Sequence, residues 1–188
     1  MKFLNKSAAI GFVLGAIIGP VVLVGGLYLF VKSQIGDLEE TGYPPPEIPY
    51  NETVSLDWSV RTLDGTALNL QRQLKDKVIF LNFWATWCPP CVGEMPSIEK
   101  LHEHFKDRVA FVCVSREDVD TIKAFQLKND YSFPLYQITE ELPDEFKTRS
   151  IPATFIISKN RKIHIRHRGG ADWSHADVID YLETMLHL

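Results

Sequence analysis

The sequence predicts an α/β fold in which a central mixed sheet carries helices on both faces, preceded by one N-terminal transmembrane helix. Three observations support this prediction. Residues 8–30 contain no charged side chain. After residue 54, short apolar runs alternate with segments whose apolar residues recur every three or four positions, a pattern typical of strands and amphipathic helices. Two cysteines, Cys88 and Cys91, stand between one apolar run and the helical pattern that follows it.

The N-terminal segment is predicted to anchor the chain in the cytoplasmic membrane. At about 1.5 Å per residue, Ala8 to Phe30 is long enough to cross a hydrocarbon core roughly 30 Å thick. A cleaved signal peptide is the alternative, but its apolar region would be about 7–15 residues long and would end at a small-x-small site, which is absent here. Two lysines precede the span, and three acidic residues follow it between positions 37 and 40. The positive-inside rule therefore makes residues 1–32 a cytoplasmic stub and anchor, with membrane contact through residues 8–31.

Residues 33–53 are predicted to form an extracytoplasmic linker. The stretch is polar and contains three consecutive prolines from Pro44, then Pro49, which is typical of a semi-rigid polyproline spacer. The domain at 54–188 would then lie in the periplasm or on the outer surface. All 24 acidic residues lie after residue 36, and the formal net charge of the chain is −4. A negative surface of this kind argues against a nucleic-acid partner.

In the first half of the domain, the sequence predicts a buried strand, then a helix, then a second buried strand. Leu56 to Leu63 alternates weakly and leads into Asp64-Gly65, a turn signal for a hairpin. Residues 77–84 form a continuous apolar run, as expected for a central strand buried on both faces. The next helix, beginning near Val92, has apolar side chains on one side at positions 92, 95, 98, 101 and 105. A second buried strand follows at 109–114.

The second half of the domain has two further capped helices. Ser115 and Asp118 are expected to start a helix whose apolar positions include Ile122. Ser174 is expected to cap the final helix, whose apolar side chains at 178, 182, 185 and 186 face inward. Between these helices the expected elements are, in order, a strand at 135–138, a helical turn at 144–147, and two strands at 154–158 and 162–168.

The motif Cys88-Pro89-Pro90-Cys91 carries the chemistry. Two cysteines separated by two residues can close a disulfide when the second lies in the first turn of a helix. Free backbone N–H groups and the positive end of the helix dipole then stabilise a thiolate on the first cysteine. The two prolines remove backbone donors and fix φ, so the loop is stiff and offers the thiolate fewer hydrogen bonds. The motif predicts redox chemistry on thiols.

Residues 54–187 resemble the TlpA/ResA-like membrane-anchored thiol–disulfide oxidoreductases, which have a thioredoxin-like fold. The resemblance rests on four segments of this sequence: LDG at 63–65, NFWATWCPPC at 82–91, EMP at 94–96 and IPATF at 151–155. A Cys-x-x-Cys pair alone would be weak evidence. The same pair preceded by FWATW and followed far along the chain by Ile-Pro-x-Thr is highly specific.

The resemblance implies roles for five residues. Cys88 would be the more exposed, nucleophilic cysteine, and Cys91 would resolve the mixed disulfide, so that the two form a redox-active disulfide. Ile151 and Pro152 would form a cis-proline loop that lies opposite the active site and docks the substrate chain. Trp87 would provide an apolar rim for the same substrate.

Glu94 is predicted to handle a proton. Thioredoxin itself has a buried aspartate six residues before the first cysteine, but here that position is Asn82, which cannot exchange a proton. In the TlpA/ResA branch a glutamate three residues after the second cysteine takes this role, and Glu94 matches it. A partly buried carboxylate there would raise the thiol pKa values and accept the proton of Cys91. A first-turn glutamate favoured only by the helix dipole is the alternative.

These observations predict an enzyme that reduces disulfides in extracytoplasmic client proteins. The resemblance makes apocytochrome c during cytochrome c maturation the leading client and a membrane electron donor the source of reducing equivalents; no cofactor or metal is expected. A general disulfide oxidase or isomerase of secreted proteins is the alternative enzyme. A copper-binding chaperone is the alternative from another class, although such proteins typically use Cys-x-x-x-Cys. A peroxidase would need a proline at position 81, which is leucine.

Overall fold

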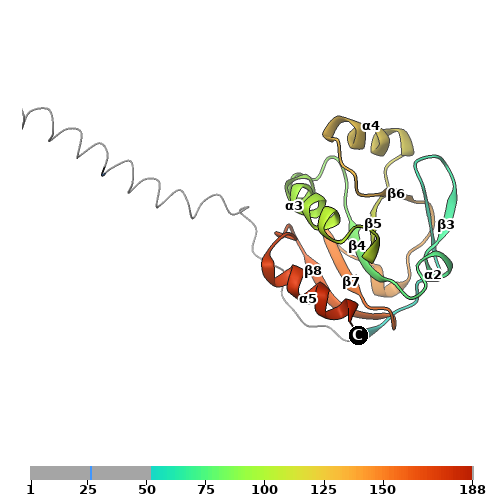
Figure 1. Cartoon of the computed structure of the whole chain (residues 1–188). Coiled ribbons are helices and arrows are strands. Elements are labelled where there is room, and N and C mark those ends of the chain that lie inside the picture. The colour runs from blue at the N-terminus through green and yellow to red at the C-terminus, as the bar shows by residue number, and fades with distance from the viewer. Residues whose placement is uncertain (1–25, 27–51, 188) are drawn as a thin grey trace, which may run out of the picture. The chain divides into compact units, whose positions relative to one another are not determined.

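The computed structural model describes Gly26 and residues 52–187. The part it describes contains a mixed sheet with strand order β1-β8-β7-β4-β5-β6-β2-β3 (Figure 1). The strands are β1 (Glu52–Thr53), β2 (Ser59–Arg61), β3 (Ala67–Asn69), β4 (Val78–Phe83), β5 (Val109–Ser115), β6 (Leu135–Ile138), β7 (Ala153–Ile157) and β8 (Lys162–Arg168). The helices are α2 (Leu70–Gln73), α3 (Pro89–Phe105), α4 (Val119–Asn129) and α5 (Ala176–Leu186), with 3-10 turns η1 (Lys106–Arg108) and η2 (Asp144–Phe146).

Strand β4 lies in the middle of the sheet. Every one of its residues is buried. It runs parallel to β5, with Val78 opposite Val109, and antiparallel to β7, with Phe83 opposite Ala153. The continuous apolar run therefore forms a strand covered on both faces, as predicted. Because β4 and β5 are parallel, the loops that follow them emerge at the same edge of the sheet.

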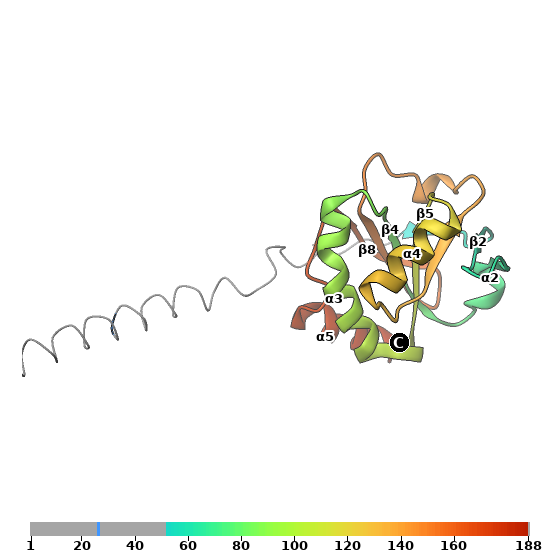
Figure 2. The ribbon, with the colours of Figure 1, turned by 90° about the horizontal axis from the view of Figure 1, so that it is seen from above.

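Helices cover both faces of the sheet, and the mixed sheet of the predicted thioredoxin-like fold is confirmed. The three long helices share one face, where Ile98 of α3, Ile122 of α4 and Leu182 of α5 belong to a single buried cluster. Figure 2 shows α3 and α4 lying side by side in front of the strands. The other face is covered by shorter segments, with Leu70 of α2 and Phe146 of η2 in a second cluster.

The predicted membrane anchor lies outside the described residues, as does nearly all of the predicted linker. Within Gly26 and residues 52–187, no helix is both long enough and apolar enough to cross a membrane.

Two helix starts differ from the sequence prediction. Helix α3 begins at Pro89 rather than near Val92, because Cys88 itself is the N-cap. The cap of α5 is His175, whose ring accepts a hydrogen bond from the backbone N–H of Asp177, so the prediction that Ser174 caps this helix is wrong. The hydroxyl of Ser174 instead donates to the carboxylate of Asp172, at 2.7 Å. Because its hydroxyl is bonded to Asp172, Ser174 does not cap α5.

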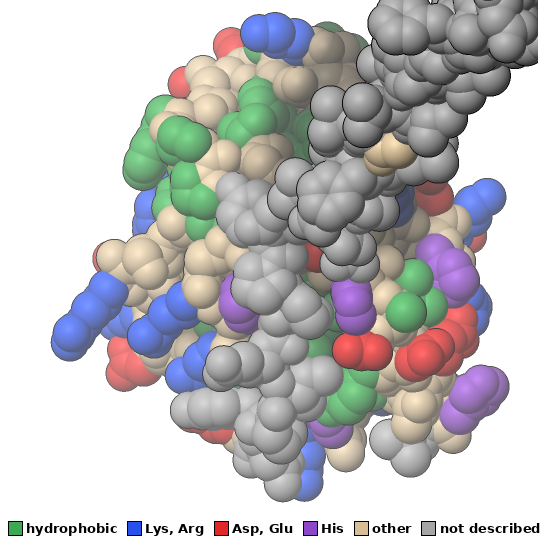
Figure 3. Space-filling view, turned by 90° about the vertical axis from the view of Figure 1, so that its left-hand side faces the viewer, with side chains coloured by type: hydrophobic (Ala, Val, Ile, Leu, Met, Phe, Trp, Pro, Cys, Tyr) green, Lys and Arg blue, Asp and Glu red, His purple; other side chains and the backbone are tan. Residues whose placement is uncertain are grey.

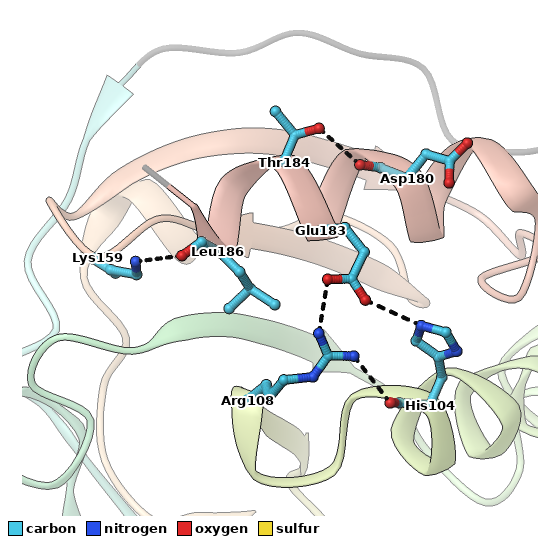
Figure 4. Close-up of polar contacts among 7 residues, drawn as sticks. All are labelled: His104, Arg108, Lys159, Asp180, Glu183, Thr184 and Leu186. Carbon is cyan, nitrogen blue, oxygen red and sulfur yellow. Dashed lines mark hydrogen bonds and ion pairs between the residues drawn. The ribbon is translucent and has the colours of Figure 1, made fainter.

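Polar contacts join the C-terminal end of α3 to α5. Glu183 accepts a hydrogen bond from Arg108 Nη1 at 2.7 Å and bonds His104 Nε2 at 3.2 Å (Figure 4). The bond from Arg108 is the main cause that lowers the pKa of Glu183. Figure 3 shows histidine and acidic side chains close together on this side of the molecule. Because these groups are solvent-exposed, their contribution to stability is small.

Candidate active site

A disulfide joins Cys88 and Cys91 at the N-terminal end of α3. The Cα atoms of the two cysteines are 5.3 Å apart. As the N-cap, Cys88 presents its Sγ to the backbone N–H of Cys91, with an N···S distance of 3.3 Å. Since Pro89 and Pro90 carry no N–H, Cys91 supplies the first free donor of the helix. Cys88 is 4 % exposed and Cys91 is fully buried, so solvent and substrate reach the pair from the side of Cys88.

The loop before Cys88 is held by Glu117, which follows β5. The Glu117 carboxylate accepts hydrogen bonds from the backbone N–H of Thr86 at 2.7 Å and from its hydroxyl at 2.6 Å. It also accepts a hydrogen bond from the hydroxyl of Ser115 at 3.1 Å. Sequence analysis did not identify Glu117. Its position directly after a parallel strand adjacent to β4 was the available signal, because such loops meet at one edge of the sheet.

Residues of the proline loop lie against the cysteine pair. The Ile151–Pro152 peptide bond is cis, as the family resemblance implies. The carbonyl oxygen of Ile151 lies 3.7 Å from Cys88 Sγ. Trp87 is 71 % exposed, whereas Trp84 is buried in the core. The structure thus places two of the predicted docking residues beside Cys88: Ile151 through its carbonyl oxygen, and Trp87 as the exposed preceding residue.

A groove extends from this point across the ends of the strands. Its volume is about 410 Å³. The lining side chains come from the loop before Cys88, from the segment after β5, and from the segment between β6 and β7. They are Phe83, Trp84, Ala85, Trp87, Val114, Ser115, Arg116, Glu117, Ile138, Leu142, Lys147, Thr148 and Ile151. The groove lies next to the cysteine pair, because its lining includes Trp87, which precedes Cys88, and Ile151, whose carbonyl oxygen is close to Cys88 Sγ.

Glu94 is buried on α3 and fully hydrogen-bonded. Its Oε1 accepts a hydrogen bond from Asn82 Nδ2 at 2.8 Å. Its Oε2 accepts from the backbone N–H of Ala171 at 3.1 Å and from Trp173 Nε1 at 2.9 Å. Asn82 Nδ2 also donates to Thr154 Oγ1 at 2.8 Å. The carboxyl that sequence analysis expected to be partly buried is 1 % exposed, and its hydrogen-bond donors come from β4 and from the segment before α5.

Burial raises the pKa of Glu94 to near neutral pH. The pKa of this carboxyl rises from 4.5 to about 7, chiefly because burial disfavours the charged form. The hydrogen bonds from Trp173, Asn82 and Ala171 oppose this rise in pKa, since they stabilise the carboxylate. A group with this pKa changes protonation readily near pH 7, as a general acid or base must.

The third cysteine lies in the core. Cys113 on β5 is fully buried opposite Asn82 of β4. Burial raises the pKa of its thiol well above the ordinary value. A thiol that stays protonated and inaccessible is inert toward disulfides.

No group of three or more His, Cys, Asp or Glu side chains within residues 52–187 is arranged to hold a metal ion. The histidines have other contacts: His102 bonds to Ser132, His104 to Glu183 and His164 to Tyr181. None of these contacts involves the cysteine pair.

The fold and the site together define the class of protein. The sheet is thioredoxin-like, and a disulfide joins the two cysteines that enclose Pro89 and Pro90 at the start of α3. The cis-proline loop lies beside the first cysteine. Together these features form a centre for dithiol–disulfide exchange. The protein is a thiol–disulfide oxidoreductase.

The chain belongs to the AhpC/TSA family, which matches residues 53–166. It is 35 % identical over 117 residues to the thioredoxin-like protein YneN of Bacillus subtilis, covering 60 % of this chain and 68 % of YneN. It is 34 % identical over 120 residues to the thiol-disulfide oxidoreductase ResA of Halalkalibacterium halodurans, covering 62 % of this chain and 67 % of that protein. A solution structure of a proposed protein disulfide isomerase from Bacteroides thetaiotaomicron superposes with a TM-score of 0.64 at 25 % identity, over 78 % of this chain and 95 % of that one. The predicted resemblance to ResA-type oxidoreductases is confirmed.

Proposed function

We propose that this oxidoreductase is tethered to the cytoplasmic membrane and reduces disulfides in extracytoplasmic client proteins. Cys88 is the nucleophile, Cys91 is the resolving cysteine and Glu94 is the proton acceptor. The observation that carries the proposal is the buried Glu94 carboxyl, which lies one helical turn after Cys91 on α3 and has a pKa of about 7.

The reaction transfers two electrons from the cysteine pair to the client. The Cys88 thiolate attacks one sulfur of the client disulfide, the client S–S bond breaks, and the released client sulfur takes a proton. The Cys91 thiol then gives its proton to Glu94 and attacks Cys88 Sγ. This second step releases the other client thiol and leaves the Cys88–Cys91 disulfide, the form present in the structure.

Asn82 is placed to accommodate the proton on Glu94. A protonated carboxyl needs a hydrogen-bond acceptor, whereas Asn82 now offers Glu94 its Nδ2 donor at 2.8 Å. The Oδ1 atom of the same amide is buried and has no partner among residues 52–187. A half-turn of the amide would place Oδ1 where Nδ2 now lies, facing both Glu94 and the hydroxyl of Thr154. The asparagine thus serves both protonation states of the carboxyl.

Two features favour the reducing direction. The Pro89-Pro90 pair leaves the backbone N–H of Cys91 as the donor to Cys88 Sγ, which limits hydrogen bonding to a thiolate. A negative charge on the nearby Glu94 disfavours a second negative charge on the cysteines. Both effects destabilise the thiolate form, and a less stable reduced state makes the pair a stronger reductant.

The midpoint potential tests this direction. We expect a value near that of thioredoxin, about −270 mV, rather than near about −120 mV, the value of a strongly oxidising protein of this fold. The measurement is equilibration of residues 52–188 with glutathione or dithiothreitol buffers, read by the mass of the alkylated pair. Cys113→Ser should leave the potential unchanged. A midpoint at the oxidising end would support the oxidase alternative instead.

Features of the sequence support the proposed location and clients. The uncharged segment at 8–30 and the lysines before it support a tether with the catalytic domain outside. A reductase in a thiol-oxidising compartment needs an electron supply, and the tether would keep it beside a membrane electron donor. Apocytochrome c, whose haem-attachment cysteines must be free thiols, is the proposed client. Immunoblotting of membrane fractions and protease accessibility in whole cells test the topology.

A further inference from the structure

The groove beside Cys88 is mainly apolar along its length. Large apolar side chains line it, including Trp84, Val114, Ile138 and Leu142. Its volume of about 410 Å³ falls within the roughly 300–1,000 Å³ of pockets that bind organic ligands, so it has room for a large side chain. Trp87 and Ile151 belong to the lining, and the carbonyl oxygen of Ile151 lies 3.7 Å from Cys88 Sγ, so a chain whose cysteine reaches Cys88 has the groove beside it.

Three charged side chains line the groove, and two of them already have polar partners: Glu117 has neutral donors and Lys147 has an ion pair. The Glu117 carboxylate is occupied by the N–H and hydroxyl of Thr86 and by Ser115. Lys147 forms an ion pair with Asp144 at 2.7 Å. Arg116 is exposed and makes no hydrogen bond or ion pair with any residue between 52 and 187. Among residues 52–187, Arg116 is therefore the cation of the lining that has no ion-pair partner, while the Glu117 carboxylate next to it in the chain is held by neutral donors.

We propose that this groove selects client segments in which a large apolar residue near the cysteine is accompanied by an acidic residue that pairs with Arg116. The inference rests on the proposed function and specifies its substrate class. The apolar side chain would supply affinity by leaving water. The carboxylate would supply selectivity, since a guanidinium binds a carboxylate with two parallel hydrogen bonds beside an apolar surface.

The test uses peptides whose single cysteine is joined by a disulfide to a chromogenic aryl thiol. Attack by reduced Cys88 on the peptide sulfur breaks that bond, forms the Cys88–peptide disulfide and releases the coloured aryl thiolate; Cys91 then frees the peptide thiol. Three peptides are compared, each with leucine near the cysteine and with Asp, Asn or Lys beside the leucine. With the pre-reduced enzyme in a single turnover, we expect the second-order rate constant for the Asp peptide to exceed that for the Asn peptide by about 3- to 10-fold at low salt, and less at high salt.

Charge variants assign this preference to Arg116. Arg116→Gln should make the Asp and Asn peptides equivalent, and Arg116→Glu should favour the Lys peptide. Lys100→Glu makes the same charge change at an exposed position of α3 outside the groove and should keep the wild-type order. Equal rates for all three peptides with the wild-type enzyme would overturn the inference and leave the reductase proposal standing. Failure to release aryl thiolate from any peptide would overturn both.

Discussion

Replacing Cys91 with alanine is expected to convert the enzyme into a trap for its clients. Cys88 of this variant can still attack a client disulfide, but no second thiol is available to break the mixed disulfide. Cys113 cannot substitute, because it is buried with a raised pKa. Adducts should therefore accumulate, to be detected as dithiothreitol-sensitive bands on non-reducing gels of membrane fractions and identified by mass spectrometry.

The controls distinguish trapping from misfolding. Cys88→Ala removes the attacking sulfur and should lose both turnover and adducts, a loss of several orders of magnitude in rate. Cys113→Ser should form no adducts and keep turnover. All three variants should keep the wild-type far-ultraviolet circular dichroism. If folded Cys91→Ala protein yielded no adducts while Cys88→Ala did, the roles of the two cysteines would have to be exchanged.

Glu94→Gln is expected to change the pH dependence of stability. The folded-state pKa of about 7 lies above the ordinary 4.5, so the folded protein binds this proton more tightly than the unfolded chain. Stability from this proton is complete below pH 4.5 and is lost as the pH rises through about 7. The variant lacks this loss, so its free energy of unfolding relative to wild type should rise by about 3 kcal/mol between pH 4 and 8.

Urea unfolding of the oxidised proteins at several pH values measures this difference. In the oxidised form, Cys88 and Cys91 do not titrate. Glu183→Gln is the matched control, because the pKa of Glu183 is lowered and the group is exposed. Its effect should be small and of opposite sign, with stability lost in wild type as the pH falls. Parallel curves for wild type and Glu94→Gln would show that Glu94 does not titrate in this range.

The same variant is expected to slow the second chemical step. Without the carboxylate, Cys91 must give its proton to solvent, and loss of a positioned base typically costs 10²- to 10⁴-fold. We expect resolution of the mixed disulfide at pH 7 to slow by about 100-fold, while attack by Cys88 continues. Rapid-quench alkylation followed by mass analysis would show the transient adduct. Equal resolution rates in both proteins would contradict the proton-acceptor role.

The cysteine pair was predictable because its geometry is local. A spacing of three residues between Cys88 and Cys91 places both at one helix start, whatever the rest of the chain does. The cis bond before Pro152 was predictable from the family motif alone, since most X-Pro bonds are trans. The strand within 77–84 was predictable because burial on both faces favours a run of apolar residues, which Asn82 alone interrupts between Val78 and Phe83.

The surroundings of Glu94 were not predictable in this way. Trp173 and Ala171 contact its carboxyl from 79 and 77 residues further along the chain. No periodicity connects these positions, so their meeting depends on how α3 packs against the segment before α5. The full burial of the carboxyl, and hence the size of its pKa shift, followed only from that packing.

The groove escaped prediction for a related reason. Leu142 and Arg116 are ordinary residues of two loops, and only the order of the parallel strands β4, β5 and β6 brings those loops to the same edge. The mistaken cap at Ser174 was a local error, because Asp172 competes for the same hydroxyl.

Cys88, Cys91 and Glu94 are all borne at the start of α3, whereas the groups that bond the carboxyl belong to other segments. A rigid slide of α3 along the sheet would leave the spacing between sulfur and carboxyl intact. It would lengthen or shorten the bonds from Asn82 and Trp173, and so alter how strongly the carboxyl holds its proton. A partner that displaced this helix would thus change the pKa of Glu94 gradually. The route of electron transfer through Cys88 and Cys91 would stay the same.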